Sequence, residues 1–478
     1  MIIGNPPYVK KEDILPPNDA EYIEELLLPE NEDQKSEASK RYKAELNLKT
    51  YETYPFLNTR LRTLIDGKIK TVAVYGDKVS GRSDLYVYFQ LLCPRYLNSN
   101  GIFCFIISNS WLDVEYGAFV QHFLLKQTRL LAVYDCSVRS FNASVNTVIY
   151  LHSALINTGG SFKTINHKTL EPPEHNVRFV MNRADYAFAA KAVFLLEQEN
   201  SPEKAFQDSY RVIPISQREL YREGYDEEDK KYVGDKWGGK YLRSPEIFFK
   251  IIKTPSLISL DDDYFECLGY VHDDNTGPRF GKVKSFIKSV KNASSISLKK
   301  HECEEYGVTA NGNSRICASI LFPRTIGDRH IILYNSIAAI GKEFYRVQPT
   351  KNAKCIAAQL NSTIGVLFRE IFGITGLGDG GLKFNLSSVK RFLVFPELTI
   401  SDEIIDTFFS RAQFHILVEL GFDRNLPIRN QQPNPLPDRK ALDDIIFDEL
   451  GLTRAERNEV YWSVAELVKQ RLDRAATR

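Results

Sequence analysis

The residues best suited to chemistry stand near the start of the chain, in the run Asn5-Pro6-Pro7-Tyr8, which we call the NPPY loop. The two prolines fix two successive φ angles and remove two backbone donors, so the loop is stiff and its carbonyl oxygens can accept hydrogen bonds. Asn5 adds a side-chain acceptor and donor, and Tyr8 adds a flat ring for stacking. Together these residues predict a loop that holds a planar, amino-bearing group with its nitrogen directed at an electrophile.

An amine on an aromatic base is a poor nucleophile, because its lone pair is delocalised into the ring. Hydrogen bonds from that amine to the Asn5 side-chain oxygen and the Pro6 carbonyl would favour a more tetrahedral, more nucleophilic nitrogen. Such a site works by positioning and electrostatics and requires no general base. A base in a duplex has to leave the stack to be reached, and stacking on Tyr8 would offset about 1–3 kcal/mol of that cost.

The elements around the NPPY loop follow an α/β pattern. The apolar run Met1–Gly4 is typical of the end of a buried parallel strand. Further strands are expected at 101–108, 130–134 and 146–151, and helices from 83 to 97 and from 116 to 126. The continuous apolar run at 101–108 is typical of a strand buried on both faces. This alternation predicts a doubly wound sheet, whose ligands bind at the carboxyl ends of the strands.

Two positions in this region have more than one interpretation. Asp84 can cap the helix that begins there, as Ser83 also can. Trp111 follows the strand at 101–108, and we expect it to pack within its loop rather than to stack on a base. Farther along, residues 235–396 hold many short β-like segments, and residues 354–372 predict a single helix with one apolar face.

The run Ile2–Val9 resembles motif IV of the amino-methylating, S-adenosylmethionine-dependent DNA methyltransferases, and its final tyrosine is typical of the adenine-N6 enzymes. Other segments are similar to motifs of the gamma class of that family: Asp84–Phe89 to motif V, Gly101–Trp111 to motif VI and Phe141–Tyr150 to motif VIII. The region 241–396 is similar to the target-recognition domain of type IIG restriction–modification enzymes.

The resemblance implies a site-specific DNA methyltransferase (adenine-N6) of a restriction–modification system. Its cofactor would be S-adenosylmethionine and its partner double-stranded DNA. The four residues of the NPPY loop would be catalytic, and Tyr8 and Phe141 would stack on the flipped base. Asp84 would contact the cofactor, as the alternative to capping its helix.

The resemblance also divides the chain into three parts. We expect a partial Rossmann-like methyltransferase domain at residues 1–175, a linker and an α+β target-recognition domain at 176–400, and a helical carboxyl-terminal region at 401–478. In the family, a Gly-rich loop and an acidic residue that bind the cofactor precede motif IV. Here only Met1–Gly4 precede it, and the glycine-rich stretch 376–381 follows a helix rather than a strand. We therefore expect the cofactor motifs, or a nuclease, on an upstream chain.

Charge is unevenly spread along a chain whose formal net charge is only +1. Residues 12–45 are rich in acids, whereas residues 279–300 hold seven basic residues and no acidic one. A basic stretch of this kind fits phosphate contact, and a solvated loop is the alternative. Taken with the recognition-domain resemblance, the predicted DNA-binding residues are Arg279, Lys282, Lys284, Lys288 and Lys291.

Other sequence features argue against several classes of protein. The chain has no apolar run near the roughly 18 residues that span a membrane and no signal peptide, which predicts a cytoplasmic protein. Its seven cysteines form no CxxC pair, so reduced thiols are expected. His301-Glu302-Cys303 lacks a second pair of ligands at metal-binding spacing, so no metal site is predicted.

Two further hypotheses stay open. Loops like the NPPY loop also occur in methyltransferases acting on glutamine amides and on guanine in ribosomal RNA, which lack a recognition domain of this size. A non-enzymatic chain, either a DNA-binding specificity subunit or a truncated remnant, would bind DNA and transfer no methyl group by itself. Binding of S-adenosylmethionine and turnover on duplex DNA distinguish an enzyme from this last class.

Overall fold

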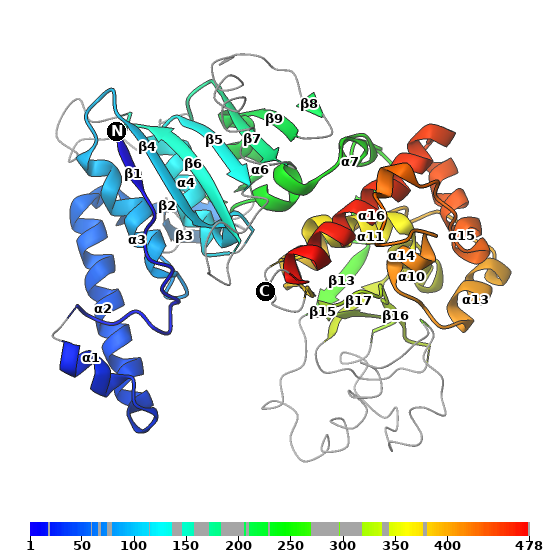
Figure 1. Ribbon diagram of the computed structural model, residues 1–478, viewed down its shortest axis with the longest axis horizontal. Coiled ribbons are helices and arrows are strands. Elements are labelled where there is room, and N and C mark those ends of the chain that lie inside the picture. The colour runs from blue at the N-terminus through cyan, green and yellow to red at the C-terminus, as the bar shows by residue number, and fades with distance from the viewer. Residues whose placement is uncertain are drawn as a thin grey trace. The chain divides into compact units, whose positions relative to one another are not determined.

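The chain divides into two compact units, Met1–Leu242 (unit 1) and Arg243–Arg478 (unit 2), in the computed structural model (Figure 1). The residues that the structure describes are 1–17, 20–58, 60–65, 68–73, 79–113, 115–135, 146–156, 172–182, 205–206, 210–227, 230–268, 296, 318–336, 344–375 and 380–476.

Unit 1 is built on a seven-stranded mixed sheet with the strand order β1-β4-β6-β5-β7-β9-β8. Its strands are β1 (Ile2–Gly4), β4 (Ile102–Ser108), β5 (Leu130–Asp135), β6 (Thr147–Ser153), β7 (Asn176–Asn182), β8 (Ala205–Phe206) and β9 (Tyr210–Ser216). β1 runs parallel to β4 and β5 runs parallel to β7, whereas β6 is antiparallel to both β4 and β5. The α/β class is confirmed. The sheet is mixed, and the expected doubly wound, Rossmann-like arrangement stays a prediction.

The reversal at β6 follows from the connection before it. Only residues 136–146 separate β5 from β6, and a parallel crossover needs a dozen or more residues, usually with a helix. A short connection instead returns the chain beside β5 in the opposite direction. Strand periodicity in a sequence carries no information on direction, so the apolar pattern alone did not reveal this reversal.

Four helices of unit 1 pack in a row: α2 contacts α3, α3 contacts α4, and α4 contacts α6. The helices of unit 1 are α1 (Ala20–Leu26), η1 (Pro29–Asn31), α2 (Glu32–Thr53), η2 (Pro55–Asn58), α3 (Leu85–Leu92), η3 (Cys93–Tyr96), η4 (Asn109–Leu112), α4 (Gly117–Gln127) and α6 (Gln217–Glu223), with η5 (Gly238–Arg243) at the junction. Two short ribbons complete the unit: β2 (Arg60–Ile65) with β3 (Lys68–Ala73), and β10 (Tyr225–Asp226) with β11 (Lys231–Tyr232).

One face of β4 is more deeply buried than the other. Phe103 and Ile107 are fully buried on one face, while Ile102, Cys104 and Ile106 on the other face are half-buried. Successive side chains of a strand point to opposite faces, so the continuous apolar run at 101–108 does not mean full burial on both faces. That part of the expectation was wrong, although the strand itself is confirmed.

The sheet continues past residue 175, since β7 and β9 are both strands of it. The segment after them also packs on unit 1. The Gln121 side chain of α4 donates to the Asp235 carbonyl at 2.9 Å and accepts from the Asp235 amide at 3.1 Å. The functional boundary expected at residue 175 stays a prediction, but the compact unit that contains the sheet ends at Leu242.

Unit 2 combines small antiparallel sheets with helices. Its four-stranded sheet has the order β13 (Phe265–Leu268), β17 (Phe344–Pro349), β14 (Ile320–Pro323), β16 (Leu333–Tyr334), and two-stranded sheets join β12 (Ile258–Ser259) to β19 (Leu393–Val394) and β15 (Thr325–Ile326) to β18 (Leu382–Lys383). Its helices are α7 (Glu246–Ile251), α10 (Ala353–Asn361), α11 (Thr363–Phe372), α12 (Leu386–Lys390), α13 (Asp402–Ser410), α14 (Ile416–Glu419), η8 (Ile428–Asn430), α15 (Pro437–Glu449) and α16 (Arg454–Ala476). Among the described residues of both units, no helix is long and apolar enough to cross a membrane.

The single helix predicted at 354–372 is two helices, α10 and α11, with a break at Ser362. Ser362 has an extended backbone, and its side chain accepts a hydrogen bond from the Gly365 amide, which caps α11. A Cβ on Gly365 would lie 2.1 Å from the Leu360 carbonyl oxygen, so the close approach at this break requires glycine. The apolar periodicity continues through the break and therefore conceals it.

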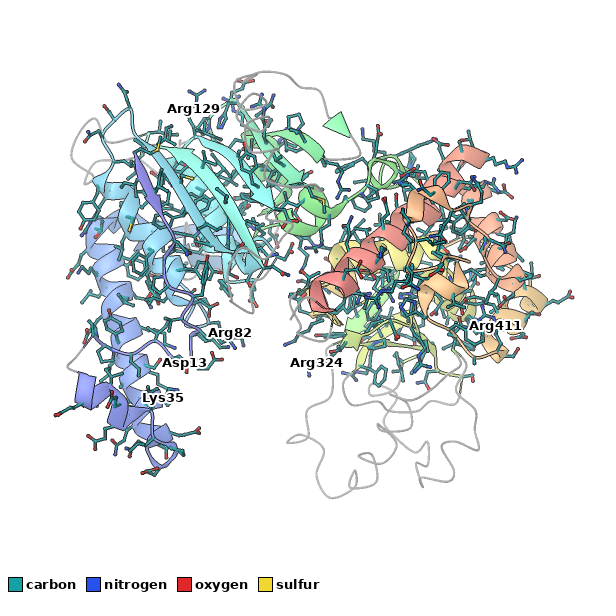
Figure 2. The ribbon with its side chains drawn as sticks, viewed as in Figure 1. Asp13, Lys35, Arg82, Arg129, Arg324 and Arg411 are labelled. Atoms are coloured by element: carbon teal, nitrogen blue, oxygen red, sulfur yellow. The ribbon has the colours of Figure 1, made fainter. Side chains whose placement is uncertain are left out.

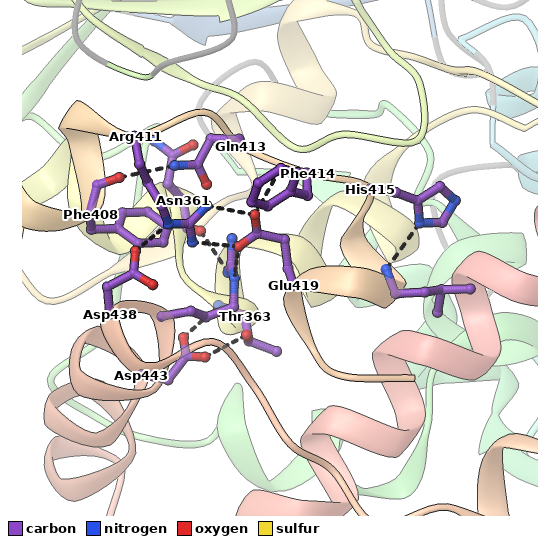
Figure 3. Close-up of polar contacts among 12 residues, drawn as sticks. Asn361, Thr363, Phe408, Arg411, Gln413, Phe414, His415, Glu419, Asp438 and Asp443 are labelled. Carbon is purple, nitrogen blue, oxygen red and sulfur yellow. Dashed lines mark hydrogen bonds and ion pairs between the residues drawn. The ribbon is translucent and has the colours of Figure 1, made fainter. Parts of the chain in front are cut away.

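Polar contacts join α14 to α15 and α15 to α11 (Figure 3). The Glu419 carboxylate of α14 accepts from Arg411 at 2.7 Å and from Arg439 of α15 at 2.8 Å. The Asp443 carboxylate of α15 accepts from the Thr363 amide at 2.7 Å and the Thr363 hydroxyl at 2.6 Å. The helical tail expected at 401–478 is thus packed into unit 2.

Candidate functional site

The NPPY loop follows β1, which ends three residues before its parallel neighbour β4 does. β1 pairs in parallel with β4, with Gly4 opposite Phe105. A Cβ on Gly4 would lie 2.6 Å from a carbon of the Phe105 ring, so only glycine lets β1 approach β4 this closely. The carboxyl ends of neighbouring parallel strands form the ligand-binding edge of α/β sheets. The loop follows a parallel strand as predicted, but that strand is not buried, because the Ile3 side chain is 72% exposed.

Within the loop, Asn5 and Tyr8 contact each other. The Tyr8 hydroxyl donates to Asn5 Oδ1 at 2.6 Å and lies 3.2 Å from the Ile106 carbonyl oxygen of β4. Asn5 and Pro7 are exposed, whereas Pro6 is buried. An amide oxygen has two lone pairs, so Asn5 Oδ1 can accept from a second donor while Tyr8 is bound. The structure brings this acceptor and this ring to one sheet edge.

Asp84 holds the segment that follows the NPPY loop. Asp84 Oδ1 accepts from the Lys11 amide at 3.0 Å, and the Val9 carbonyl accepts from the Leu85 amide at 3.0 Å. Asp84 occupies the N-cap position of α3, but its side chain makes no capping hydrogen bond. Burial raises the pKa of the Asp84 carboxyl, and the Lys11 amide opposes that rise. The capping interpretation is thus wrong for the side chain, and cofactor contact stays a prediction.

Four hydroxyl groups that the sequence did not reveal gather at the end of β4. The Tyr86 and Tyr116 hydroxyls lie 2.9 Å apart, and those of Ser108 and Ser110 lie 3.0 Å apart. Burial raises the pKa of Tyr86 well above its ordinary value. Burial, followed by the charge of Asp84, raises the pKa of Tyr116 to about 12. Both phenols are therefore neutral at pH 7 and can donate hydrogen bonds.

The sequence does contain a signal for this cluster. Tyr86 lies inside the run Asp84–Phe89 that resembles motif V, and Ser108 is the last residue of an apolar strand. A polar residue that ends a buried strand marks the same sheet edge as the NPPY loop. Ser108 also lies two residues after Ile106, whose carbonyl oxygen faces the Tyr8 hydroxyl.

Trp111 packs inside unit 1, as expected. Its side chain is fully buried. Its ring meets Tyr150 edge-on with centroids 5.5 Å apart and Trp237 edge-on with centroids 5.9 Å apart. Gly117 packs against the Trp111 backbone, where a Cβ would lie 1.8 Å from the carbonyl oxygen. These contacts leave Trp111 no surface for stacking on a base.

The remaining predicted site residues lie outside the described part of the chain. This holds for Phe141, the second candidate for base stacking, and for the basic stretch between β13 and β14. The predicted DNA-binding residues in that stretch are Arg279, Lys282, Lys284, Lys288 and Lys291. Their roles stay predictions.

The site thus consists of an exposed amide acceptor, an adjacent aromatic ring and neutral hydroxyls at the ligand-binding edge of an α/β sheet. Comparison with known proteins bears on the class of this chain. Residues 55–141 match the family described as Eco57I restriction-modification methylase. The matched segment contains α3, β4, α4 and β5 and begins after the NPPY loop. It supports a methyltransferase of a restriction–modification system.

Among solved structures, the chain is similar to the type IIG restriction endonuclease BpuSI, at 10% sequence identity and a TM-score of 0.34. The match covers 84% of this chain and 51% of that chain. The chain therefore spans about half the length of that enzyme. At these values the likeness assigns no role to any residue here.

Proposed function

We propose that this chain contributes the target-base site of a site-specific DNA methyltransferase (adenine-N6) of a restriction–modification system. The observation that carries the proposal is the placement of Asn5 Oδ1, exposed at the end of β1 and 2.6 Å from the Tyr8 hydroxyl. The match of residues 55–141 to a methylase family supports the same class from a separate part of the chain.

In this proposal the adenine amine donates to Asn5 Oδ1 and to the Pro6 carbonyl, which concentrates its lone pair on the nitrogen. Tyr8 stacks on one face of the flipped base and offsets part of the cost of unstacking. Phe141 is proposed for the second contact with that base. S-adenosylmethionine is the proposed methyl donor and would supply the electrophilic carbon.

The described residues fit the binding of the target base better than the binding of the methyl donor. Asn5 is exposed and keeps a lone pair for an amine. Asp84, the one predicted cofactor contact, already accepts from the Lys11 amide through Oδ1. We therefore propose no reaction step through Asp84 and assign it to holding the segment after the NPPY loop.

Target recognition is proposed for residues 243–400. The proposed region begins at residue 243 and not at 176, because β7 and β9 belong to the sheet of unit 1. The basic stretch 279–300 would contact phosphates, which gives affinity and salt dependence without sequence preference. Cytoplasmic location is expected for an enzyme that acts on chromosomal DNA.

The direct test is a titration of S-adenosylmethionine into the purified chain, followed by a transfer assay on duplex DNA. Cofactor binding and the appearance of N6-methyladenine are expected for the proposed enzyme. DNA binding with neither of these would favour the non-enzymatic specificity subunit or remnant. Methylation of guanine in RNA, or of glutamine amides, would favour the other methyltransferase classes that share this loop.

A further inference from the structure

One face of α2 holds the segment that follows the NPPY loop. Lys35, Ser39 and Lys43 occur at four-residue steps of this helix, which places them in one row along its surface. Lys35 Nζ lies 2.8 Å from Asp13 Oδ1, and Figure 2 labels this pair. The Lys11 carbonyl accepts from Ser39 Oγ at 3.3 Å and from Lys43 Nζ at 3.0 Å.

Lys43 also reaches a second loop. Its Nζ lies 3.4 Å from the Gly81 carbonyl oxygen, in the loop that leads into α3. Two turns farther along α2, the Tyr51 hydroxyl accepts from the Val79 amide of that same loop at 3.0 Å. Lys43 therefore joins the segment after the NPPY loop to the loop before Asp84. The Lys11 amide and Asp84 Oδ1 join the same two segments at 3.0 Å.

These polar contacts explain why a helix with so little apolar surface docks here. Ser39 and Thr50 are the buried residues of α2, so burial of apolar side chains contributes little to its attachment. An ammonium that donates to carbonyls makes charge-assisted hydrogen bonds, which are stronger than neutral ones. Burial lowers the pKa of Lys43, while the Glu12 carboxylate opposes that change. The ammonium is thus partly desolvated, and its two carbonyl acceptors take the place of water.

We propose that Lys43 is a positioning residue for the NPPY loop. Its ammonium fixes the distance between the segment after that loop and the loop before α3, so the Asn5 acceptor is held where the target amine arrives. The inference rests on the proposed function, since positioning matters only if a base is bound there. Small displacements of a reacting group can lower a rate by up to about a hundredfold.

The test compares Lys43→Met with Lys43→Arg and with Lys40→Met, a matched control at an exposed position of the same helix. Hydrogen exchange of peptides covering residues 5–13 and 79–88 reports on the two loops without any need for activity. Lys43→Met should speed exchange in both peptides, and Lys40→Met should leave it unchanged. Lys43→Arg, which can still donate to both carbonyls, should restore slow exchange. Unchanged exchange in Lys43→Met would overturn the inference.

Methyl transfer supplies the second readout. The kcat of Lys43→Met should fall by about tenfold to a hundredfold, with KM for DNA and the urea midpoint close to wild type. Faster exchange with an unchanged kcat would show that Lys43 orders the loops but does not position the reaction. A wild-type chain that transfers no methyl group would overturn the proposed function, while the exchange data would still decide whether Lys43 holds the loops.

Discussion

At the scale of single residues, Tyr8 has two parts that could contribute to the site: its hydroxyl and its ring. The hydroxyl lies 2.6 Å from Asn5 Oδ1 and can orient the amide. The ring is the part that could stack on a base. Asn5 is exposed, so its oxygen remains within reach of a second donor. Substitutions that remove the hydroxyl alone or the whole ring distinguish these contributions.

Tyr8→Phe keeps the ring and should retain most of the methyl transfer. Tyr8→Ala removes the stacking surface, worth about 1–3 kcal/mol per base, so its kcat/KM for transfer to duplex DNA should fall about tenfold to a hundredfold. The two variants are compared in one steady-state assay. If Tyr8→Phe is impaired as strongly as Tyr8→Ala, the hydroxyl contact with Asn5 matters more than stacking.

The place of the NPPY loop after a strand could be predicted from the types and order of its residues, whereas its catalytic role stays a prediction. Two adjacent prolines, an amide and an aromatic ring after an apolar strand restrict what the loop can do. Tyr86 and Tyr116 could not be predicted as a pair, because their hydroxyls meet only after α3 and the start of α4 have folded beside each other. For Asp84 the residue type was misleading. Aspartate is a favourable N-cap residue, so its side chain was expected to cap α3, but it accepts from the Lys11 amide instead.

At the scale of elements, a buried charge cluster joins α11 to α16. The Glu370 carboxylate accepts from Arg369 at 2.5 Å and from Arg471 at 2.9 Å, and all three side chains are buried. Burial alone would raise the pKa of Glu370, but Arg471 and Arg369 outweigh it and lower the pKa to about 2. The folded state therefore favours the ionised carboxylate.

Glu370→Gln should lower the free energy of unfolding at pH 7 by about 3 kcal/mol, because two buried guanidinium groups lose their counter-charge. Below the ordinary carboxyl pKa the unfolded chain takes up the proton first. The stabilisation from Glu370 is thus complete above about pH 4.5 and is lost as the pH falls toward 2. Urea unfolding of wild type and variant should therefore show a difference smaller by about 1 kcal/mol at pH 3.5 than at pH 7.

Glu397→Gln is the control for this experiment. Glu397 pairs with Lys351 at 2.9 Å, and both side chains are exposed, so its loss should change stability little. A Glu370→Gln variant as stable as Glu397→Gln, or a difference that does not depend on pH, would contradict the account of the cluster.

Helices and strands were predicted well where apolar periodicity was strong, and poorly where polar contacts determine how an element packs or where it ends. β4, α4 and β5 lie where the pattern indicated. The 22-residue α2 was not predicted, since its side chains show almost no apolar face and its docking uses Lys35, Ser39 and Lys43. The break between α10 and α11 was missed because Ser362 and Gly365 interrupt the backbone without interrupting the apolar stripe.

At the scale of the whole molecule, the α/β class follows from the sequence, but the strand order does not. The position of β6 between β4 and β5 depends on pairing between segments that are distant in the sequence. Local sequence patterns do not predict such pairing. The same holds for the extent of unit 1, because β7 and β9 join a sheet whose other strands end by residue 153, apart from the short β8.

Charge reversal of Lys284, Lys288 and Lys291 to Glu should weaken DNA binding nearly equally for all sequences. Removing one phosphate contact should reduce the slope of log K against log salt concentration by about 0.9. The slope is measured by fluorescence anisotropy with labelled duplexes between low and moderate salt. An unchanged affinity and slope would remove the basic stretch from the proposed interface.

The control for this charge reversal is a triple variant with the same change in net charge. Lys40, Lys49 and Lys253 are exposed and lie outside the basic stretch. Reversing them to Glu should leave the salt slope closer to wild type. An equal weakening of binding in both triple variants would mean that overall charge, rather than phosphate contact by the basic stretch, controls binding.

The central claim is that the NPPY loop holds the amine of a target adenine. The most direct measurement is nucleoside mass spectrometry of DNA from methylation-deficient cells that express either the wild-type protein or Asn5→Ala. We expect N6-methyladenine with wild type and none with Asn5→Ala, while DNA affinity of the variant stays near normal. Equal N6-methyladenine from both forms, or none from either, would contradict the claim.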